Sequence, residues 1–341
     1  MKLKLCSDTF VFWRKEQGGE RMFKFIVAGI TQLEMIIKTK GLPVTYEPFT
    51  DAHDGLHMSA GGDAFNESLA LKWLGDEVAF MTVVGRSQSL DIFNPPGREV
   101  TLDTDYVLPI LNETPMEVLL YDDKRNQQVF DDLKDIREAT YDMTLAEPLS
   151  KDADMFVLSN ANFCRPFIDL AKRRDKKLAV KIHNFVRDKE KFNVDFLENA
   201  NILYFSDTSI NEDPFDFVQS IADTYHTDII ILGQGSRGVI LYDRYRKIKV
   251  HYDPVKAGKV VNVAGEGNAI FACFLHYFLK TEDPKVAIHK ALLFGSHKIG
   301  YLGTSDGFMT EEELDRWDNL IWNPAGGGAL NNFDLSGFKF N

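Results

Sequence analysis

The chain has 341 residues, of which 44% are hydrophobic, so a large core can be buried and wholesale disorder is not expected. Its 51 acidic residues outnumber its 39 basic residues, and a net charge of -12 argues against nucleic acid or a membrane surface as the main partner. No uncharged apolar run reaches the roughly 18 residues of a membrane span. Three dispersed cysteines are typical of a reducing cytoplasm rather than of a disulfide framework.

The first predicted strand, FKFIVAGI, begins directly after Met22. Residues 1–21 lack the continuous apolar region and the small-residue cleavage site of a signal peptide. Two interpretations of this segment stay open. It is either an upstream extension that precedes a natural start at Met22, or a short ordered arm.

Apolar runs and amphipathic stretches then alternate along the chain. The expected strands are VAFMTVVG, MFVLS, LAVKI, NILYF and DIIIL. The expected helices between them include FIDLAKRR and FDFVQSIADTY. This alternation predicts βαβ units and therefore an α/β fold, with a mainly parallel sheet flanked by helices.

A second pattern appears near residues 44–60 and 106–131, where short strands follow one another without a helix between them. Turns are expected at Asn112-Glu113 and Asp122-Asp123, so these segments predict a small antiparallel sheet beside the main one. The α/β domain is expected to span residues 22–318. The Gly- and Asn-rich tail, residues 319–341, is expected to be a surface wrap or loosely ordered.

The stretch GGDAFNESLALKWLG is the first candidate binding segment. Gly61 and Gly62 allow close approach of a ligand to the backbone, and a helix with one apolar stripe follows them. Asn66 lies in the first turn of that helix, where its amide could bind a hydroxyl-bearing ligand. The alternative is a glycine turn before a core helix.

A second candidate is ILGQGSRGVILYDRYRKIKVHY, in which Gly233, Gly235 and Gly238 form a G-x-G-x-x-G pattern after a strand. The residues that follow are typical of strands. Because no helix N-terminus is available to bind a pyrophosphate, a Rossmann site is not expected. A hairpin turn is the simpler interpretation, and contact with the edge of a nucleotide stays open.

The third candidate is AGEGNAIFACFLHYFL, a glycine-bracketed turn before a helix that is apolar on nearly all sides. Gly265 and Gly267 leave backbone N–H groups free at the helix start, which predicts an oxyanion or phosphate site. Glu266 places a negative charge between them, and Asn268 stands at the junction. The alternative is a tight turn into a core helix.

Histidines give no metal pattern. Six of the eight histidines are His183, His226, His251, His276, His289 and His297. Their spacing is irregular, so each is expected on the surface or in core packing, and no metal site is predicted.

In order and spacing, the three candidate segments resemble the ribokinase/PfkB family of sugar kinases, from about Phe23 to about Trp317. The family signature GG-x(3)-N corresponds to Gly61, Gly62 and Asn66, and the signature D-T-x-G-A-G-D corresponds to NVAGEGN at residues 262–268. The resemblance implies a ribokinase-like, doubly wound α/β domain with a small β lid. It also implies ATP with Mg²⁺ as phosphoryl donor, a sugar or related polyol as acceptor, and a homodimer paired through the lid.

The resemblance also assigns roles to individual residues. The base position is Asn268, and the anion-hole positions are Gly265, Glu266 and Gly267. The implied sugar-site residues are Glu34, Gly61, Gly62 and Asn66. The implied nucleotide-binding residues are Gly233, Gly235, Gly238 and Ser296.

Departures from the family pattern concentrate at these catalytic positions. The base is an amide, the small residue of the turn is Glu266, and the N-x-x-E motif of the family corresponds to Ser206-Asp207-Thr208-Ser209. This predicts a family member that binds a sugar or a nucleotide but has weakened or lost phosphoryl transfer. The alternative is a divergent active kinase that uses another acid, such as Glu266 or Asp207.

Overall fold

The computed structural model describes residues 21–124 and 126–322, except for the side chains of Lys189 and Trp322. The predicted extension at residues 1–21 and the predicted tail at residues 319–341 lie almost wholly outside the described residues.

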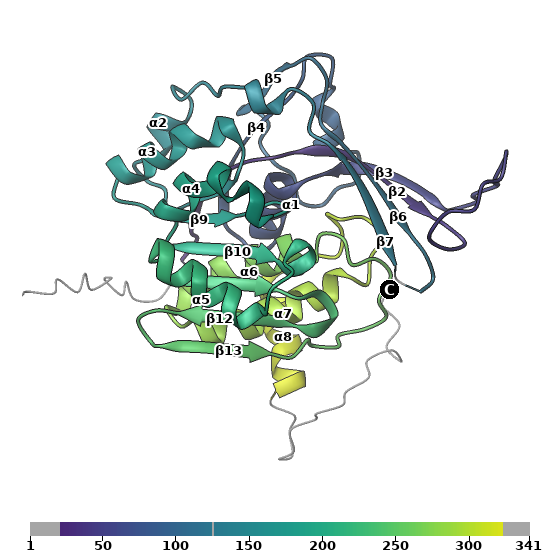
Figure 1. Ribbon diagram of the computed structural model, residues 1–341. Helices are drawn as coiled ribbons and strands as arrows, with labels where there is room; N and C mark the ends of the chain where they lie inside the picture. The colour runs from purple at the N-terminus through teal and green to yellow at the C-terminus, as the bar shows by residue number, and fades with distance from the viewer. Residues whose placement is uncertain (1–20, 125, 323–341) are drawn as a thin grey trace, which may run out of the picture.

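A nine-stranded sheet forms the centre of the molecule (Figure 1). In spatial order its strands are β13 (Ile248–Tyr252), β12 (Val239–Asp243), β11 (Ile229–Gly233), β10 (Ile202–Ser206), β9 (Lys177–Lys181), β8 (Met155–Ser159), β1 (Lys24–Ala28), β4 (Glu77–Gly85) and β5 (Val107–Leu111). All strands from β11 to β5 are parallel, and β12 and β13 are antiparallel additions at one edge. The strand order reverses direction between β1 and β8, and such a switch point is where open α/β sheets bind ligands.

Helices cover both faces of this sheet, so the predicted α/β class and the mainly parallel sheet are confirmed. One face packs against α1 (Asp63–Trp73), α6 (Glu266–Thr281), α7 (Pro284–Lys298) and α8 (Glu311–Trp322). The other packs against α2 (Ala146–Leu149), α3 (Arg165–Arg173), α4 (Glu190–Asn199) and α5 (Pro214–Tyr225). Short 3₁₀ turns are η1 (Leu90–Phe93), η2 (Ile136–Glu138), η3 (Asn162–Cys164), η4 (Arg187–Lys189), η5 (Asp207–Ser209) and η6 (Gly235–Arg237).

Local sequence explains where several of these elements begin. Helices α5 and α7 each start with a proline, and the side chains of Asp213 and Asp283 accept hydrogen bonds from the first-turn N–H groups. Helix α6 starts after Gly265 and is buried continuously from Asn268 to Tyr277, as its all-round apolar sequence predicts. This burial fixes the position of its N-terminus next to the carboxyl ends of the parallel strands.

A second sheet of four strands projects from the body (Figure 1) and is called the lid here. Its order is β3 (Leu56–Gly61), β2 (Gln32–Lys38), β6 (Met116–Tyr121) and β7 (Gln127–Asp132). The pairs β3–β2 and β6–β7 are antiparallel, whereas β2 and β6 run parallel. The smaller sheet is thus present but not purely antiparallel.

The predicted lid segments were partly wrong. Strand β2 was not predicted, residues 44–55 contain no strand, and residues 107–111 form β5 at the edge of the large sheet. The last difference has a simple cause, because Val107 and Leu111 are buried and the apolar run VLPIL suits a strand packed against the core. The two predicted turns do lie in the connections that flank β6.

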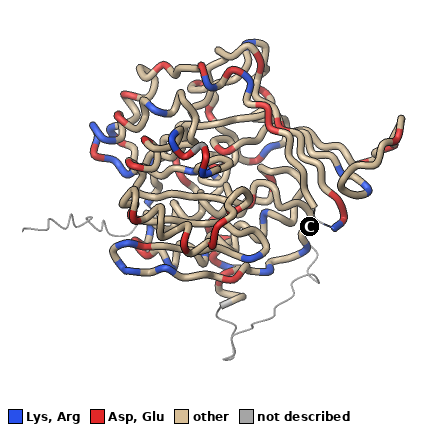
Figure 2. The backbone as a smooth tube through the Cα atoms, viewed as in Figure 1, with Lys and Arg blue, Asp and Glu red and all other residues tan. Residues whose placement is uncertain are grey.

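Acidic and basic residues are interspersed along the backbone that is visible in Figure 2. No helix in the described ranges is long and apolar enough to cross a membrane.

Candidate functional site

A cleft of about 560 Å³ lies where the lid meets the carboxyl ends of the parallel strands. Lid strands β2, β6 and β7 form one wall, and the ends of β9, β10 and β11 form the other. The N-termini of α1 and α6 also line it. The volume is in the range of small-molecule sites. Two chemically different ends can be distinguished, and they are called the sugar end and the phosphate end here after the ligands that the sequence predicts for them.

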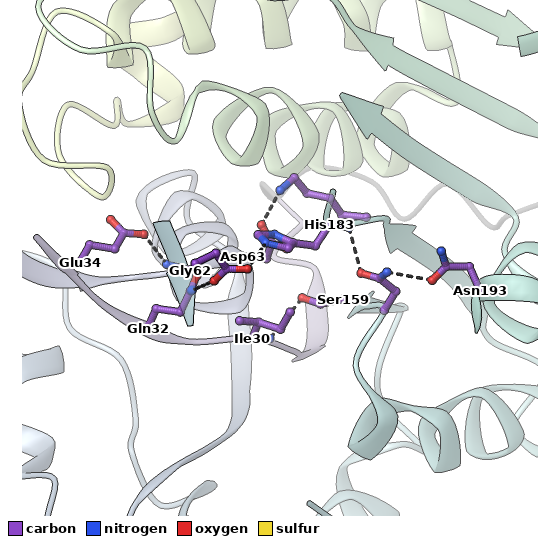
Figure 3. Close-up of polar contacts among 11 residues, drawn as sticks. Ile30, Gln32, Glu34, Gly62, Asp63, Ser159, His183 and Asn193 are labelled. Carbon is purple, nitrogen blue, oxygen red and sulfur yellow. Dashed lines mark hydrogen bonds and ion pairs between the residues drawn. The ribbon is translucent and has the colours of Figure 1, made fainter. Parts of the chain in front are cut away.

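At the sugar end, Glu34 of β2 points to the first turn of α1 (Figure 3). Its carboxylate accepts a hydrogen bond from the N–H of Gly62 at 2.7 Å and another from the hydroxyl of Thr304. A Cβ atom on Gly61 would overlap the Glu34 carboxyl group, so this close approach requires glycine. Burial raises the pKa of Glu34, although Thr304, Gly62 and Lys298 favour its charged form.

Asp63, the first residue of α1, joins the body to the lid through His183 (Figure 3). Asp63 forms an ion pair with Lys181 and another, at 3.2 Å, with Nδ1 of His183. The other ring nitrogen of His183, Nε2, lies 3.5 Å from the carboxylate of Asp131 on β7. Gln32 on β2 donates to the same Asp131 at 2.6 Å. Burial alone would raise the pKa of Asp63, but Lys181 and His183 lower it, so the carboxylate stays ionised.

The inner face of the lid carries a row of acids. Strand register places Glu34 opposite Glu117 and Glu117 opposite Asp131. Burial and the neighbouring Glu34 raise the pKa of Glu117 to about 7. Two buried acceptors nearby, Gln32 Oε1 and Asn66 Oδ1, have no hydrogen-bond partner in the described structure. The sugar end therefore has hydrogen-bond acceptors without a protein partner, which suits a ligand with many hydroxyl donors.

Several of these groups were missed from sequence. His183 was expected in packing or on the surface, yet it lies in the cleft. The available signal was its place just after a predicted parallel strand, because the carboxyl ends of such strands form ligand sites. Asp131 and Thr304 gave no local signal, since their relevance depends on contacts with His183 and Glu34 far away in sequence.

At the phosphate end, the turn before α6 has the geometry of an anion site. Gly265 has a φ of 82°, which favours glycine, and it precedes the first helical turn. In the described structure no protein acceptor is recorded for the N–H groups of Gly265, Gly267 and Asn268. Asn268 is buried at 7% exposure, and its Oδ1 has no hydrogen-bond partner. Free N–H groups and the helix dipole both favour a negative ligand here.

Glu266 lies within this same turn and lines the cleft. Burial raises its pKa to about 7, against the opposing effect of Lys298. Its side-chain stem passes close to Gly295 of α7, where a Cβ atom would lie 3.5 Å from Glu266 Cγ. A carboxyl group of this kind is partly ionised at neutral pH, so it adds some negative charge next to the free N–H groups.

The predicted nucleotide residues gather around a second, much smaller space. Gly233, Gly235, Gly238 and Ser296 line a pocket of about 20 Å³, which is near the size of one water molecule. Tyr204 also lines this space, and a Cβ atom on Gly267 would lie 2.9 Å from its hydroxyl oxygen.

The glycine-rich segment itself is a hairpin connection. Turn η6 joins the antiparallel strands β11 and β12, so the hairpin interpretation is confirmed and the Rossmann site is excluded. The hydroxyl of Ser296 accepts a hydrogen bond from the N–H of Ala257 at 2.9 Å, which holds the loop after β13 over this pocket.

Asp207, the other acid considered as a base or metal ligand, is already engaged. It accepts a hydrogen bond from Gln234 at 3.1 Å and forms an ion pair with Arg237. Among the described residues no group of three or more His, Cys, Asp or Glu side chains could hold a metal ion. Mg²⁺ that arrives with a nucleotide is held mainly by phosphates and water, so a single carboxylate such as Asp207 fits that mode of binding.

Comparison with known proteins agrees with this architecture. A family model described as "pfkB family carbohydrate kinase" matches residues 22–311. A nucleoside kinase of Methanocaldococcus jannaschii is 22% identical over 324 residues, covering 89% of this chain and 97% of that protein. The deoxyribokinase of Salmonella typhi is 28% identical over 91 residues, which are 27% of this chain and 29% of that protein. The chain thus matches less than a third of the deoxyribokinase.

Among solved structures, Arabidopsis thaliana ribokinase complexed with ribose and ATP is similar in fold. The TM-score is 0.69 at 15% identity, and the alignment covers 87% of this chain and 99% of the ribokinase. At this identity the likeness concerns the fold.

Proposed function

The chain belongs to the pfkB family of carbohydrate kinases, and from this premise we propose that it binds a sugar or a related polyol but transfers phosphoryl groups to it only weakly. The observation that carries the proposal is the position of Asn268 in the cleft, beside the free N–H groups of the α6 turn. Phosphoryl transfer to an alcohol needs a group that accepts the hydroxyl proton. An asparagine carbonyl can hold that hydroxyl but leaves its proton in place.

The sugar end supports binding of a polyhydroxylated ligand. Glu34 is oriented by Gly62 and Thr304, and Asp63 by Lys181 and His183. Groups whose orientation is fixed before binding lose little freedom when the ligand arrives.

The relatives indicate candidate ligands. Their names refer to deoxyribose, to nucleosides and to ribose with ATP, so a pentose, or the sugar of a nucleoside, and ATP with Mg²⁺ are the first compounds to try. Nucleotide binding is proposed to be weak, because Glu266 adds negative charge and the pocket beside Ser296 is small.

A second candidate function is that of an active kinase with a different base. Burial raises the pKa of Glu266 to about 7, which is suited to general-base catalysis near neutral pH. Asp207 is less suited, because its carboxylate is paired with Arg237.

The test measures ATP-dependent phosphorylation over a panel of sugars and nucleosides for the unmodified chain, Asn268→Asp, Glu266→Ala and the double variant. We expect the Asn268→Asp change alone to do little, because Glu266 still crowds the anion site. The double variant is expected to raise turnover by roughly 10²-fold or more, beyond the sum of the two single effects. Robust turnover of the unmodified chain that neither single change abolishes would contradict weak catalysis. Loss of that turnover in Glu266→Ala alone would favour the second candidate.

We further propose that two copies of the chain pair through the outer face of the lid. Successive side chains of a strand point to opposite faces of the sheet. Because the acids of the lid face the cleft, their neighbours along the strands face outward, and these include the apolar residues Leu56, Met58, Met116 and Phe130. Met58 is 62% and Phe130 53% exposed, which leaves an apolar sheet face uncovered.

Light scattering over a range of protein concentrations tests this pairing. Met58→Lys should weaken the dimer, whereas Leu320→Lys, at an exposed apolar position on α8, should not. A monomer at every workable concentration would rule the dimer out.

A further inference from the structure

Lys298, the last residue of α7, is an unusual cation because its side chain is completely buried. Its ammonium group donates a hydrogen bond to the carbonyl oxygen of Ala264, in the turn before α6. The charged groups that influence it come from three other segments: Glu34 on β2, Glu266 on α6 and Asp306 in the connection to α8. A lysine is rarely kept in such a place without a specific partner, since removing an ammonium group from water is costly.

The contact with Ala264 has a consequence for the next peptide group. In a trans peptide the carbonyl oxygen and the following N–H point in opposite directions. Because the Ala264 carbonyl is directed to Lys298, the N–H of Gly265 is directed away from Lys298. Ala264 and Gly265 both line the cleft, and Lys298 does not. Lys298 thus sets the direction of one of the free N–H groups.

Packing makes this arrangement specific. A Cβ atom on Gly265 would lie 3.1 Å from Lys298 Cε and would overlap the carbonyl oxygen of Thr304. The positive φ of Gly265 is equally unsuited to a larger residue. The turn is therefore closed on one side by the lysine and open to the cleft on the other.

We propose that Lys298 is a positioning residue for anion binding. Lys298 holds the Ala264–Gly265 peptide group so that the N–H of Gly265 faces a tetrahedral anion. The positive charge of Lys298 also balances the negative charge of the Glu266 carboxylate. The ligand class is the terminal phosphate of a nucleotide, or another tetrahedral dianion. The inference rests on the proposed function for the identity of the anion, but not on whether phosphoryl transfer occurs. It explains how an anion site can contain an acid between its two glycines.

Electrostatics adds a distinctive pH dependence. Burial lowers the pKa of Lys298 to about 8, although Glu34, Asp306 and Glu266 oppose this, and burial raises the pKa of Glu266 to about 7. Below both values the acid is neutral and the lysine is charged, which favours an anion. Above both values the acid is charged and the lysine is neutral, which disfavours it. Anion affinity should therefore fall as pH rises, in a lower step governed mainly by Glu266 and an upper step governed mainly by Lys298.

The experiment measures dissociation constants for sulfate and for ATP with Mg²⁺ on the full chain between about pH 6 and pH 9, where the charge of sulfate does not change. The variants are Lys298→Met, Lys298→Arg and Glu266→Gln. The matched control is Lys290→Met, a largely buried lysine of the same helix that pairs with Asp315 and Asp318.

Lys298→Met is expected to weaken sulfate and ATP binding by roughly tenfold or more at neutral pH. Lys290→Met should leave it unchanged. Lys298→Arg should keep most of the affinity and lose the upper pH step, because arginine does not titrate in this range. Glu266→Gln should lose only the lower step.

Three outcomes would overturn the proposal: equal affinity in Lys298→Met, an upper step that persists in Lys298→Arg, or no anion binding by the unmodified chain at any pH. If Lys298→Met does not fold, the pH profiles of the unmodified chain and Lys298→Arg still decide. The sugar-panel assay is independent, since sugar binding can fail while anion binding still depends on Lys298.

Discussion

The two ends of the cleft are built on different principles. At the sugar end, Glu34 contacts groups from two other segments of the chain, and Asp63 contacts Lys181 and His183 at the end of β9. At the phosphate end, the Oδ1 atom of Asn268 has no partner in the described structure, and the free donors are backbone N–H groups. Backbone geometry depends on glycines and on where a helix starts, whereas proton transfer depends on one side chain. An anion site can therefore keep its shape after its catalytic chemistry has changed.

The largest effect on stability is expected at Asp63, whose carboxylate forms ion pairs with two cations at the sugar end. Asp63→Asn would leave Lys181 and His183 as partly buried cations without the buried carboxylate that they share. We expect a loss of about 3–5 kcal/mol in the free energy of unfolding, measured by urea denaturation. The control is Asp123→Asn, which removes an exposed ion pair with Lys38 and should change the free energy of unfolding far less, because exposed ion pairs contribute little to stability. Equal losses in the two variants would contradict this account of the sugar end.

The next prediction separates the two ends by ligand. Glu34→Gln keeps the shape of the side chain but removes its charge, so polyol affinity should fall by about 10- to 100-fold. ATP affinity should change by less than about threefold. Glu266→Gln should do the reverse, strengthening ATP binding several-fold by removing a charge from the anion site. Calorimetric titration of both variants with both ligands checks this. If each substitution changed both affinities equally, the division of the cleft would be wrong.

A smaller effect concerns stability and pH at both ends. Burial raises the pKa values of Glu117 and Glu266 to about 7, so the folded state binds protons that the unfolded chain releases at lower pH. This proton binding stabilises the folded state fully at a pH below the pKa that the two carboxyl groups have in the unfolded chain. The stabilisation is lost as the pH rises through about 7. Glu117→Gln and Glu266→Gln should each reduce that loss by about 1 kcal/mol, measured as unfolding free energies at about pH 5 and pH 8. A pH dependence that neither variant changes would argue against both shifts.

The smallest effect is expected where the lid reaches the phosphate end. Gln127 on β7 donates a hydrogen bond to Asn262 at 3.1 Å. Because Gln127 is exposed, water can replace this bond, and Gln127→Ala should change ligand affinities by less than about threefold. A larger loss of ATP affinity, with polyol affinity unchanged, would show that the lid helps to organise the phosphate end.

Much of the fold could be predicted from sequence, because buried parallel strands leave continuous apolar runs. The segment MFVLS coincides with β8, and the glycine-bracketed turns identified the starts of α1 and α6. Strand β2 was missed because its mixed sequence, QLEMIIK, becomes a strand through pairing with β3 and β6.

The partners of the site residues were beyond local patterns. Lys181 lies 118 positions from Asp63, and Thr304 lies 270 positions from Glu34, so only the folded chain brings them together. Lys298 is a similar case, because nothing in the local sequence of α7 marks the lysine at its end as buried. The burial of its ammonium group depends on the turn that α6 places beside it.

The two faces of the lid belong to the same strands, and this has a consequence for how the molecule responds to ligand. Glu34 faces the cleft while its neighbour Met35 faces outward, so a shift of β2 on binding moves both surfaces together. In the proposed pair, which shares the outer face, a ligand that shifts β2 in one cleft would change the free energy of the shared sheet and hence the affinity of the other cleft. Ligand binding by the proposed pair would then be cooperative, and the half-saturating ligand concentration would depend on the protein concentration.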